Sequence, residues 1–335
     1  MSKYLLIIGC DVSKSVIDIS YREHSNSEVV YLGRYSNNEK GFVDFKQSLL
    51  ELTSSKVDTW FICFENTGVY SKKLLHWSIE NKILCKEEDP IRISRSLGIR
   101  RGKSDKLDSK VICQYAFEKQ DSLTLSTLIK PELGKIKKLL SRRDLLVKHR
   151  TALHVSLKEQ KGVMEDELLK SLMEANDILI RTYNEQIKEL EKSIKTIIES
   201  DEELERNDNL VQSVVGVGHI TSAYILSITN NFKEFKDAKK FACYCGISPF
   251  PNSSGTKNGR RRVSHLANKK MKSLLSNCIL STLRYDPEIS KYYARKKEEG
   301  KKSGVVFNAI KNKLIQRVFA VVKRGTPYVK IMTYA

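Results

Sequence analysis

The sequence predicts a mixed α/β protein with an α/β N-terminal part, a helical middle and a mainly helical C-terminal part. Three observations predict this division. Short apolar runs separated by polar breaks fill the first third, as buried strands do. Residues 166–206 contain neither Pro nor Gly and place apolar residues at helical spacing. The last third combines helical patterns with a large excess of Lys and Arg. We therefore expect domains at residues 1–125, 126–207 and 208–335.

The first domain alternates strands and helices. We expect strands over residues 4–10, 16–21, 29–35, 59–64 and 83–86. Helices are expected to begin at Asn37–Asn38, at Ser71 as a cap, and at Pro90, the last reaching Gln120. Three strands, helix, strand, helix, strand, helix is the order of a RuvC/ribonuclease-H-like fold.

The middle predicts two long helices, over residues 131–161 and 166–206. From Ile180 the apolar residues of the second follow a heptad seam, which indicates an antiparallel helical hairpin or a coiled coil that dimerises. Two glycines, Gly216 and Gly218, then open another helix, as in a helix-hairpin-helix turn. They serve either backbone geometry or phosphate contact. A loop over residues 252–262 and helices over 265–285 and 305–323 complete the chain.

The net charge of +19 is concentrated at one end of the chain. Residues 232–335 hold 24 Lys and Arg against 6 Asp and Glu, and so carry 18 of the 19 net charges. Such asymmetry favours a polyanionic partner, because Lys and Arg displace counterions from phosphates. The alternative is a merely basic, solvated surface.

The seven cysteines contain no CxxC pair. Several lie in apolar runs, so we interpret them as buried free thiols in a reducing compartment rather than as metal ligands. The N-terminal apolar run is short for a signal peptide, and no run approaches the roughly 18 to 20 residues of a membrane span. We therefore expect a cytoplasmic protein with no membrane partner.

Four carboxylates lie at positions typical of the ligands of a two-metal site. Asp11 and Glu65 follow or end two apolar strands, and Asp105 and Asp108 share one helical face within a basic segment. Carboxylates that converge on two cations about 4 Å apart catalyse phosphoryl transfer, and hard oxygen ligands suit Mg²⁺, with Mn²⁺ as an alternative. Each carboxylate alone is as easily a turn or surface residue.

The motifs GCDVSK, FENTGVY and KSDKLDSKVI, with GVGHITSAYIL and the NSSGTKNGRRR segment, resemble the DEDD-type insertion-sequence transposases related to pilin-gene invertases. This family consists of bridge-RNA-guided serine recombinases. The resemblance covers nearly the whole chain. It implies that Ser254, or its neighbour Ser253, attacks a DNA phosphate to form a phosphoserine link. It also implies donor and target DNA, a noncoding guide RNA, and dimers that assemble into tetramers.

Candidate residues follow from these arguments. Catalysis is assigned to Asp11, Glu65, Asp105, Asp108 and Ser254, the first four also as metal ligands. Phosphate contacts are assigned to Arg100, Arg101, Lys103, Lys257, Arg260, Arg261, Arg262, Lys269 and Lys270. Whether the metal site and the serine act in cis or in trans stays open.

Three other functions fit parts of the sequence. A RuvC-like metal nuclease or Holliday-junction resolvase would use water and need no serine. An actin-like sugar kinase would use GCDVSK as a phosphate turn, but leaves the basic last third unexplained. A non-enzymatic nucleic-acid-binding protein accounts for the charge but not for four ordered carboxylates.

Overall fold

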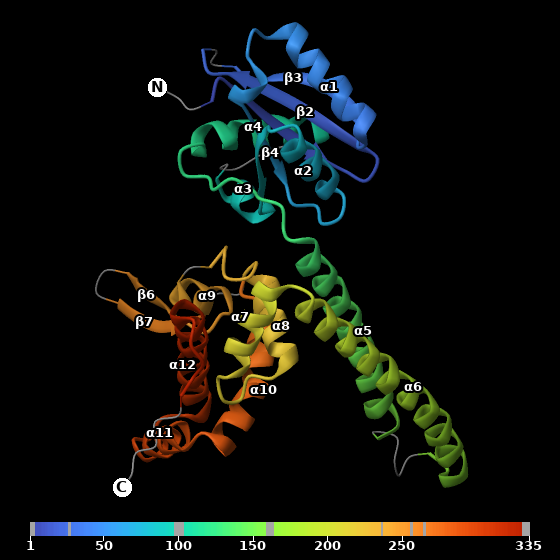
Figure 1. The fold of residues 1–335 in the computed structure, drawn as a ribbon, viewed down its shortest axis with the longest axis vertical. Coiled ribbons are helices and arrows are strands. Elements are labelled where there is room, and N and C mark those ends of the chain that lie inside the picture. Colours follow the sequence, from blue (N-terminus) through green and yellow to red (C-terminus); the bar gives the residue numbers. More distant parts are fainter. Residues whose placement is uncertain are drawn as a thin grey trace. The chain divides into compact units, whose positions relative to one another are not determined.

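The protein is described by a computed structural model that covers residues 4–25, 28–96, 104–158, 164–235, 237–254, 257–263 and 266–329, with backbone alone over 251–262. The chain forms two compact units, Met1–Leu128 and Ile129–Ala335. Figure 1 traces both, and each is described by itself.

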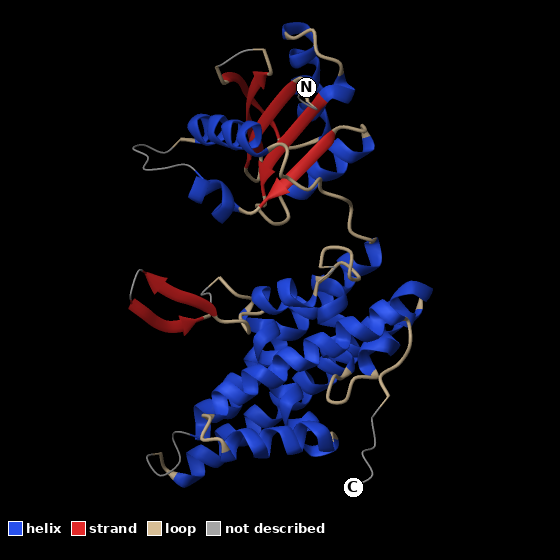
Figure 2. Cartoon of the chain, turned by 90° about the vertical axis from the view of Figure 1, so that its left-hand side faces the viewer, coloured by secondary structure: helices blue, strands red, loops and turns tan. Residues whose placement is uncertain are grey.

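The first unit is built on a five-stranded mixed sheet, drawn in red in Figure 2. Its spatial order is β3-β2-β1-β4-β5, with β1–β2 and β2–β3 antiparallel and β1–β4 and β4–β5 parallel. The strands are β1 Leu6–Val12, β2 Val16–Glu23, β3 Val30–Ser36, β4 Trp60–Glu65 and β5 Leu84–Glu88. The structure confirms the mixed α/β class, and this sheet order is consistent with a ribonuclease-H-like first domain.

Helices cover both faces of this sheet. They are α1 Glu39–Leu52, α2 Ser71–Glu80, α3 Pro90–Ser96 and α4 Asp105–Lys119, with a 3-10 turn at Val57–Thr59. On one face α1 and α2 bury Phe42, Phe45 and Trp77 against the sheet. On the other, α4 buries Ile112 and Cys113. Because strand side chains alternate between faces, odd-numbered β1 residues point to α4 and even-numbered ones to α1 and α2.

Several predicted boundaries in this unit were wrong. β1 begins and ends two residues later than expected, so Asp11 lies inside the strand rather than after it. Ser71 is the first helical residue of α2, and the cap is Tyr70. The single helical stretch predicted from Pro90 to Gln120 is two helices, α3 and α4, because Ser104 caps a new start by accepting from the Leu107 amide.

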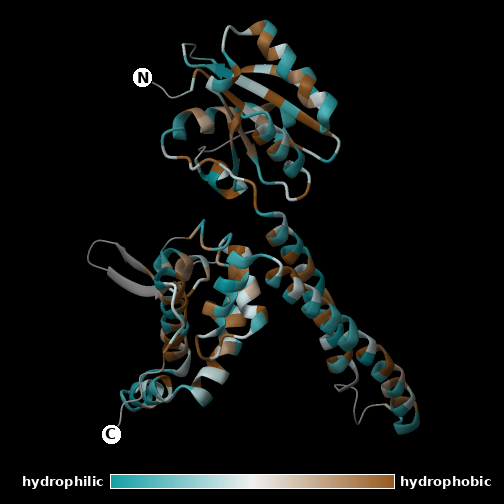
Figure 3. Cartoon of the chain, in the orientation of Figure 1, coloured by the Kyte–Doolittle hydropathy of each residue, from teal (hydrophilic) through white to brown (hydrophobic). Residues whose placement is uncertain are grey.

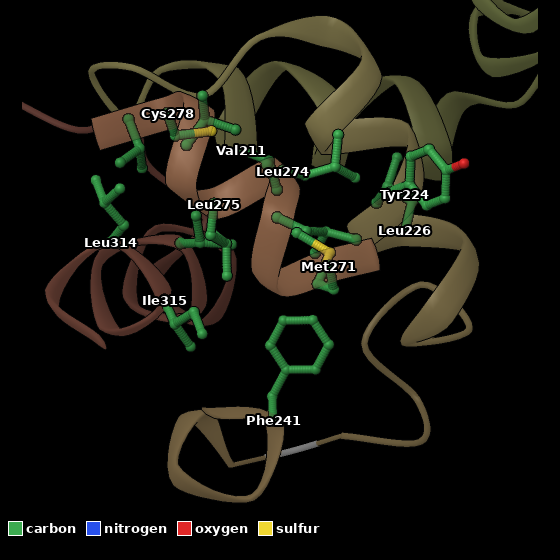
Figure 4. Packing of buried hydrophobic residues seen from close by; sticks show 14 of the residues in the cluster. Val211, Tyr224, Leu226, Phe241, Met271, Leu274, Leu275, Cys278, Leu314 and Ile315 are labelled. Carbon is green, nitrogen blue, oxygen red and sulfur yellow. The ribbon is translucent and has the colours of Figure 1, made fainter. Parts of the chain in front are cut away.

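The second unit is helical apart from one hairpin. Its elements are α5 Pro131–Lys158, α6 Asp166–Glu199, α7 Glu202–Gln212, α8 His219–Ile228, α9 Ala238–Tyr244, β6 Phe250–Ser254, β7 Lys257–Arg262, α10 Lys269–Tyr285, α11 Pro287–Glu298 and α12 Ser303–Arg324. One apolar core contains residues from the first turns of α5, from the end of α6 and from each of the helices α7 to α12. Figure 4 shows part of it, with the Phe241 ring facing Met271.

Helices α5 and α6 pair with each other in an antiparallel hairpin. Arg143 binds Glu191 at 2.7 Å and Arg150 binds Asn184 at 2.7 Å, so residues further along α5 meet residues earlier in α6. The seam residues Ile180, Ile187 and Ile194 are buried along this pair. Figure 3 shows the alternation of brown and teal along both helices. The heptad pattern predicted either an antiparallel hairpin or a coiled coil that dimerises, and the structure shows the hairpin within one chain.

Several predictions in the second unit were wrong or incomplete. The helix predicted to reach Arg206 ends at Glu199, because Asp201 accepts from the Leu204 amide and caps α7. Part of the predicted 252–262 loop forms the β6–β7 hairpin. Helix α11 was not predicted, although Asp286 and Pro287 form a strong start signal. Among the described residues no helix is long and apolar enough to cross a membrane.

Candidate metal centre and serine hairpin

A row of charged residues crosses the sheet at the level of Asp11. The strand registers pair Arg34 with Asp18, Asp18 with Asp11, and Glu65 with Glu88. Strands β1 and β4 are parallel neighbours, and their last paired residues are Cys10 and Phe64. Asp11 comes directly after Cys10, and Glu65 directly after Phe64. Since directly paired residues share a face, the row lies on the face that α4 covers.

Helix α4 brings two more carboxylates to this row. Asp105 and Asp108 lie in its first turn. The helix comes close to the sheet because β1 carries a glycine: a Cβ on Gly9 would fall 2.2 Å from the Cys113 nitrogen and 2.5 Å from the Ser109 carbonyl oxygen. A 2.8 Å hydrogen bond between the hydroxyls of Ser20 and Ser109 fixes the same contact. The predicted quartet is therefore assembled from β1, β4 and α4.

The electrostatic environment of Asp11 includes the other three carboxylates. Burial, then the negative charges of Asp108, Asp105, Glu65 and Asp18, raise the pKa of Asp11 from 3.8 to about 6. Concentrated negative charge at a partly buried point is the environment that a divalent cation stabilises. The all-oxygen donor set suits a hard cation such as Mg²⁺.

The carboxylates do not converge as metal ligands do. In the part of the chain that the structure describes, no three His, Cys, Asp or Glu side chains are arranged to hold a metal ion. Asp105 is turned to Arg34, whose Nη2 donates to Asp105 Oδ2 at 2.7 Å. The residue types and their electrostatics fit a metal, whereas the side-chain arrangement differs from that of a loaded site.

The predicted nucleophile lies on the hairpin that joins α9 to α10. Ser254 is the last residue of β6 and pairs with Lys257 of β7, and Ser253 pairs with Asn258. Gly255 falls outside the described residues. The hairpin belongs to the second unit and the carboxylates to the first.

The glycine turn before α8 is explained by packing. Gly216 has φ of +92°, and a Cβ there would fall 2.8 Å from the Cys278 carbonyl oxygen of α10. Gly218 is the N-cap of α8. The positive φ and the close contact with α10 therefore require glycine at position 216, whether or not this turn also contacts a phosphate.

Models of known families match both parts of the chain. One, described as a transposase with the DEDD motif, matches residues 8–160, and another, described as the transposase IS116/IS110/IS902 family, matches residues 208–294. The chain belongs to this transposase family. It is therefore an enzyme of DNA transposition or recombination, and its DEDD domain implies a divalent metal cation and DNA as substrate.

Two of the relatives of this transposase extend the match over nearly the whole chain. It is 26% identical to the pilin gene-inverting proteins of Moraxella lacunata and Moraxella bovis, over 96% of this chain and 97% of each relative. It is 23% identical to the transposase of insertion sequence IS1328 from Yersinia enterocolitica, over 69% of this chain and 75% of the relative.

The predicted phosphate-binding residues of the transposase lie in different parts of the chain. Arg100, Arg101 and Lys103 lie outside the described residues, and Lys257 and the three arginines Arg260, Arg261 and Arg262 are placed by backbone alone, on β7. Lys269 is exposed at the start of α10. Its neighbour Lys270 instead binds Asp144 at 2.6 Å. That carboxylate also accepts from the Tyr224 hydroxyl.

Sequence reasoning missed the residues that flank the quartet. Asp18 and Glu88 are both buried, and each accepts from a tyrosine hydroxyl, at 2.6 Å from Tyr31 and 3.2 Å from Tyr115. The signal for Asp18 was present, because an aspartate inside the apolar run VIDIS must be paired to be buried. Its main partner, Arg34, depends on a strand register that the sequence does not reveal.

Proposed function

We propose that this transposase cuts and rejoins DNA strands by metal-dependent phosphoryl transfer with a serine nucleophile. The observation that carries the proposal is the placement of Asp11 and Glu65 at one level of two parallel strands, on the sheet face against which α4 packs with Asp105 and Asp108 in its first turn. The ligands would be Asp11, Glu65, Asp105 and Asp108, and Mg²⁺ is the cation that carboxylates favour for this chemistry. When bound, such cations activate the attacking hydroxyl and stabilise the leaving oxygen.

The protein's own nucleophile would be Ser254. Its Oγ attacks a DNA phosphorus, an Oγ–P bond forms, and the P–O bond to one deoxyribose oxygen breaks. The serine proton leaves with the released deoxyribose hydroxyl. Because the phosphodiester energy is kept in the phosphoserine link, the reverse attack by a deoxyribose hydroxyl rejoins strands without ATP. Water in place of serine would give free ends, as in a resolvase-like nuclease.

Two partners belong to the same proposal. A noncoding guide RNA is supported by the family resemblance and by the basic last third of the chain. A tetramer formed from two dimers is supported by the count of strands, because exchange between two duplexes breaks four strands. Purified protein carrying a discrete RNA species, identified by sequencing, would support the first of these.

The decisive experiment is a search for the covalent adduct. A nicked or phosphorothiolate DNA substrate should trap the transposase, and mass spectrometry of peptides should locate the link on Ser254. Ser254→Ala should stop cleavage with folding and DNA binding intact, and Ser253→Ala serves as the matched control. Cleavage by the double alanine variant, with no adduct in the wild type, would identify a water-using nuclease. An adduct on Ser253 would move the assignment by one residue.

A second arm tests the metal ligands. Asp105→Asn with Asp108→Asn removes two negative charges from α4 without changing side-chain size. This double variant should bind DNA but not recombine it in Mg²⁺ or Mn²⁺. Full activity of the variant would refute the assignment of the carboxylate site.

A further inference from the structure

Arg34 bridges two acidic residues, Asp18 and Asp105, at the edge of the row of charged residues that crosses the sheet. Its Nε donates to Asp18 Oδ2 at 3.0 Å, and its Nη2 lies 3.0 Å from the same Asp18 oxygen and donates to Asp105 Oδ2 at 2.7 Å. One guanidinium thus joins β2, β3 and the first turn of α4. The planar fork of arginine makes this possible, because it presents several donors in fixed directions.

The two ends of this bridge differ in how firmly they are held. The Asp18 side chain is 3% exposed and also accepts from the Tyr31 hydroxyl at 2.6 Å. The Asp105 side chain is 58% exposed. A buried carboxylate needs its partner, whereas an exposed ion pair adds little stability and is easily exchanged. Arg34 is therefore anchored at Asp18 and exchangeable at Asp105.

We propose that Arg34 competes with the divalent cation for Asp105, so that it limits metal loading of the transposase. The inference rests on the proposed metal site. A guanidinium that holds Asp105 Oδ2 turns this carboxylate to β3, and its positive charge opposes a cation beside it. It also offsets the mutual repulsion of Asp11, Asp105 and Asp108 before a cation arrives. Arg34 is thus a positioning residue for Asp105.

The test is direct binding of Mn²⁺ to the full-length protein, followed by the electron paramagnetic resonance signal of the free ion. Arg34→Gln alone would leave Asp18 buried without its cation, so the main variant is Asp18→Asn with Arg34→Gln. The amide oxygen introduced by Asp18→Asn can still accept from the Tyr31 hydroxyl. We expect the double variant to bind Mn²⁺ roughly two- to fivefold more tightly than the wild type, the range expected for losing an exposed ion pair.

Arg22→Gln is the control, because Arg22 lies on the same face of the sheet but binds Gln114 at 3.0 Å and stacks over Phe117. It removes one positive charge without touching Asp105 and should leave the Mn²⁺ affinity unchanged. An equal gain in Arg22→Gln, or unchanged or weaker Mn²⁺ binding in the double variant, would overturn the competition.

Asp11→Asn separates this inference from the proposed function. If it abolishes Mn²⁺ binding while the double variant shows no gain, the metal site stands and the role of Arg34 fails. If Asp11→Asn binds Mn²⁺ like the wild type, the metal site itself is wrong, and the competition fails with it. Loss of binding in Asp11→Asn together with the gain in the double variant supports both.

Discussion

Gly9 of β1 lies against the backbone of Cys113 in α4, where any side chain would meet the helix at 2.2 Å. The contact involves backbone on both sides, so no side chain can move away to relieve it. It sets the distance between the sheet that carries Asp11 and the helix that carries Asp105 and Asp108.

Gly9→Ala should therefore destabilise the first unit and separate the two halves of the carboxylate site. Overpacking of a close contact costs about 1–3 kcal/mol, and backbone contact on both sides places this one at the upper end. Thermal unfolding measures the loss. Gly134→Ala is the control, because nothing lies within 4 Å of that Cβ position in α5 and alanine favours helix. Equal unfolding temperatures for Gly9→Ala and wild type would contradict this close packing.

The raised pKa of Asp11 predicts how metal-free stability depends on pH. Burial and the neighbouring carboxylates raise this pKa from 3.8 to about 6, so the folded state binds more protons than the unfolded state between these values. The contribution of Asp11 is thus fully present below pH 3.8 and is lost as pH rises through about 6.

Urea denaturation of the chelator-treated protein from pH 4 to pH 7 measures this contribution as the difference between wild type and Asp11→Asn. The wild type should lose stability relative to the variant over that range. Addition of Mg²⁺ at pH 7 should restore it in the wild type alone. A difference that stays constant with pH would show that the carboxylates do not interact.

Lys269 and Lys270 are adjacent but should respond differently to substitution. Lys269 is exposed, so Lys269→Gln should lower the slope of log DNA affinity against log salt by about 0.9 and leave stability unchanged. Lys270 binds Asp144, so Lys270→Gln should cost about 0.2–1 kcal/mol of stability. Salt titrations of DNA binding and thermal unfolding separate the two. Equal salt slopes for Lys269→Gln and wild type would remove Lys269 from the DNA contact.

The helical hairpin exposes apolar side chains along the first half of α6. Ile178 is 65% exposed and Met173 51%, and Leu168, Leu172 and Leu179 are also exposed. Such a patch favours association, so we expect dimers through it. Ile178→Glu should shift light scattering from dimer to monomer, whereas Ser193→Glu, exposed further along α6, should not. A wild type that is monomeric with and without nucleic acid would contradict this interface.

The sequence was sufficient for the parts of the site that depend on local pattern. Asp11 and Glu65 stand out because each interrupts or ends an apolar strand, and the parallel pairing of β1 and β4 brings both to one level. Asp105 and Asp108 stand out because three residues separate them on one helix. The helices and strands of the first unit could also be predicted from local pattern. The exception is Ser104, which caps a new helix where one continuous helix was predicted.

Pairings between distant strands could not be predicted in this way. Arg34 meets Asp18 through the β2–β3 register, which shifts at Ile19/Ser20, and an irregularity of one residue changes every later pair. The β6–β7 hairpin was predicted as a loop because its polar residues lack the apolar alternation of a buried strand. Helix α6 ends where Asp201 caps the next helix, α7, and the heptad pattern of apolar residues carries no information about this cap.

All seven cysteines are free, and six of them are buried. Burial raises the pKa of the thiols of Cys10, Cys63, Cys85, Cys113, Cys245 and Cys278. A maleimide reacts with the thiolate at an accessible sulfur, so these six should label slowly. Cys243 is half-buried on α9, the helix that precedes the serine hairpin, and offers an attachment point for a fluorophore without mutagenesis. Movements of that hairpin during strand exchange could then be followed by light emission in the native protein.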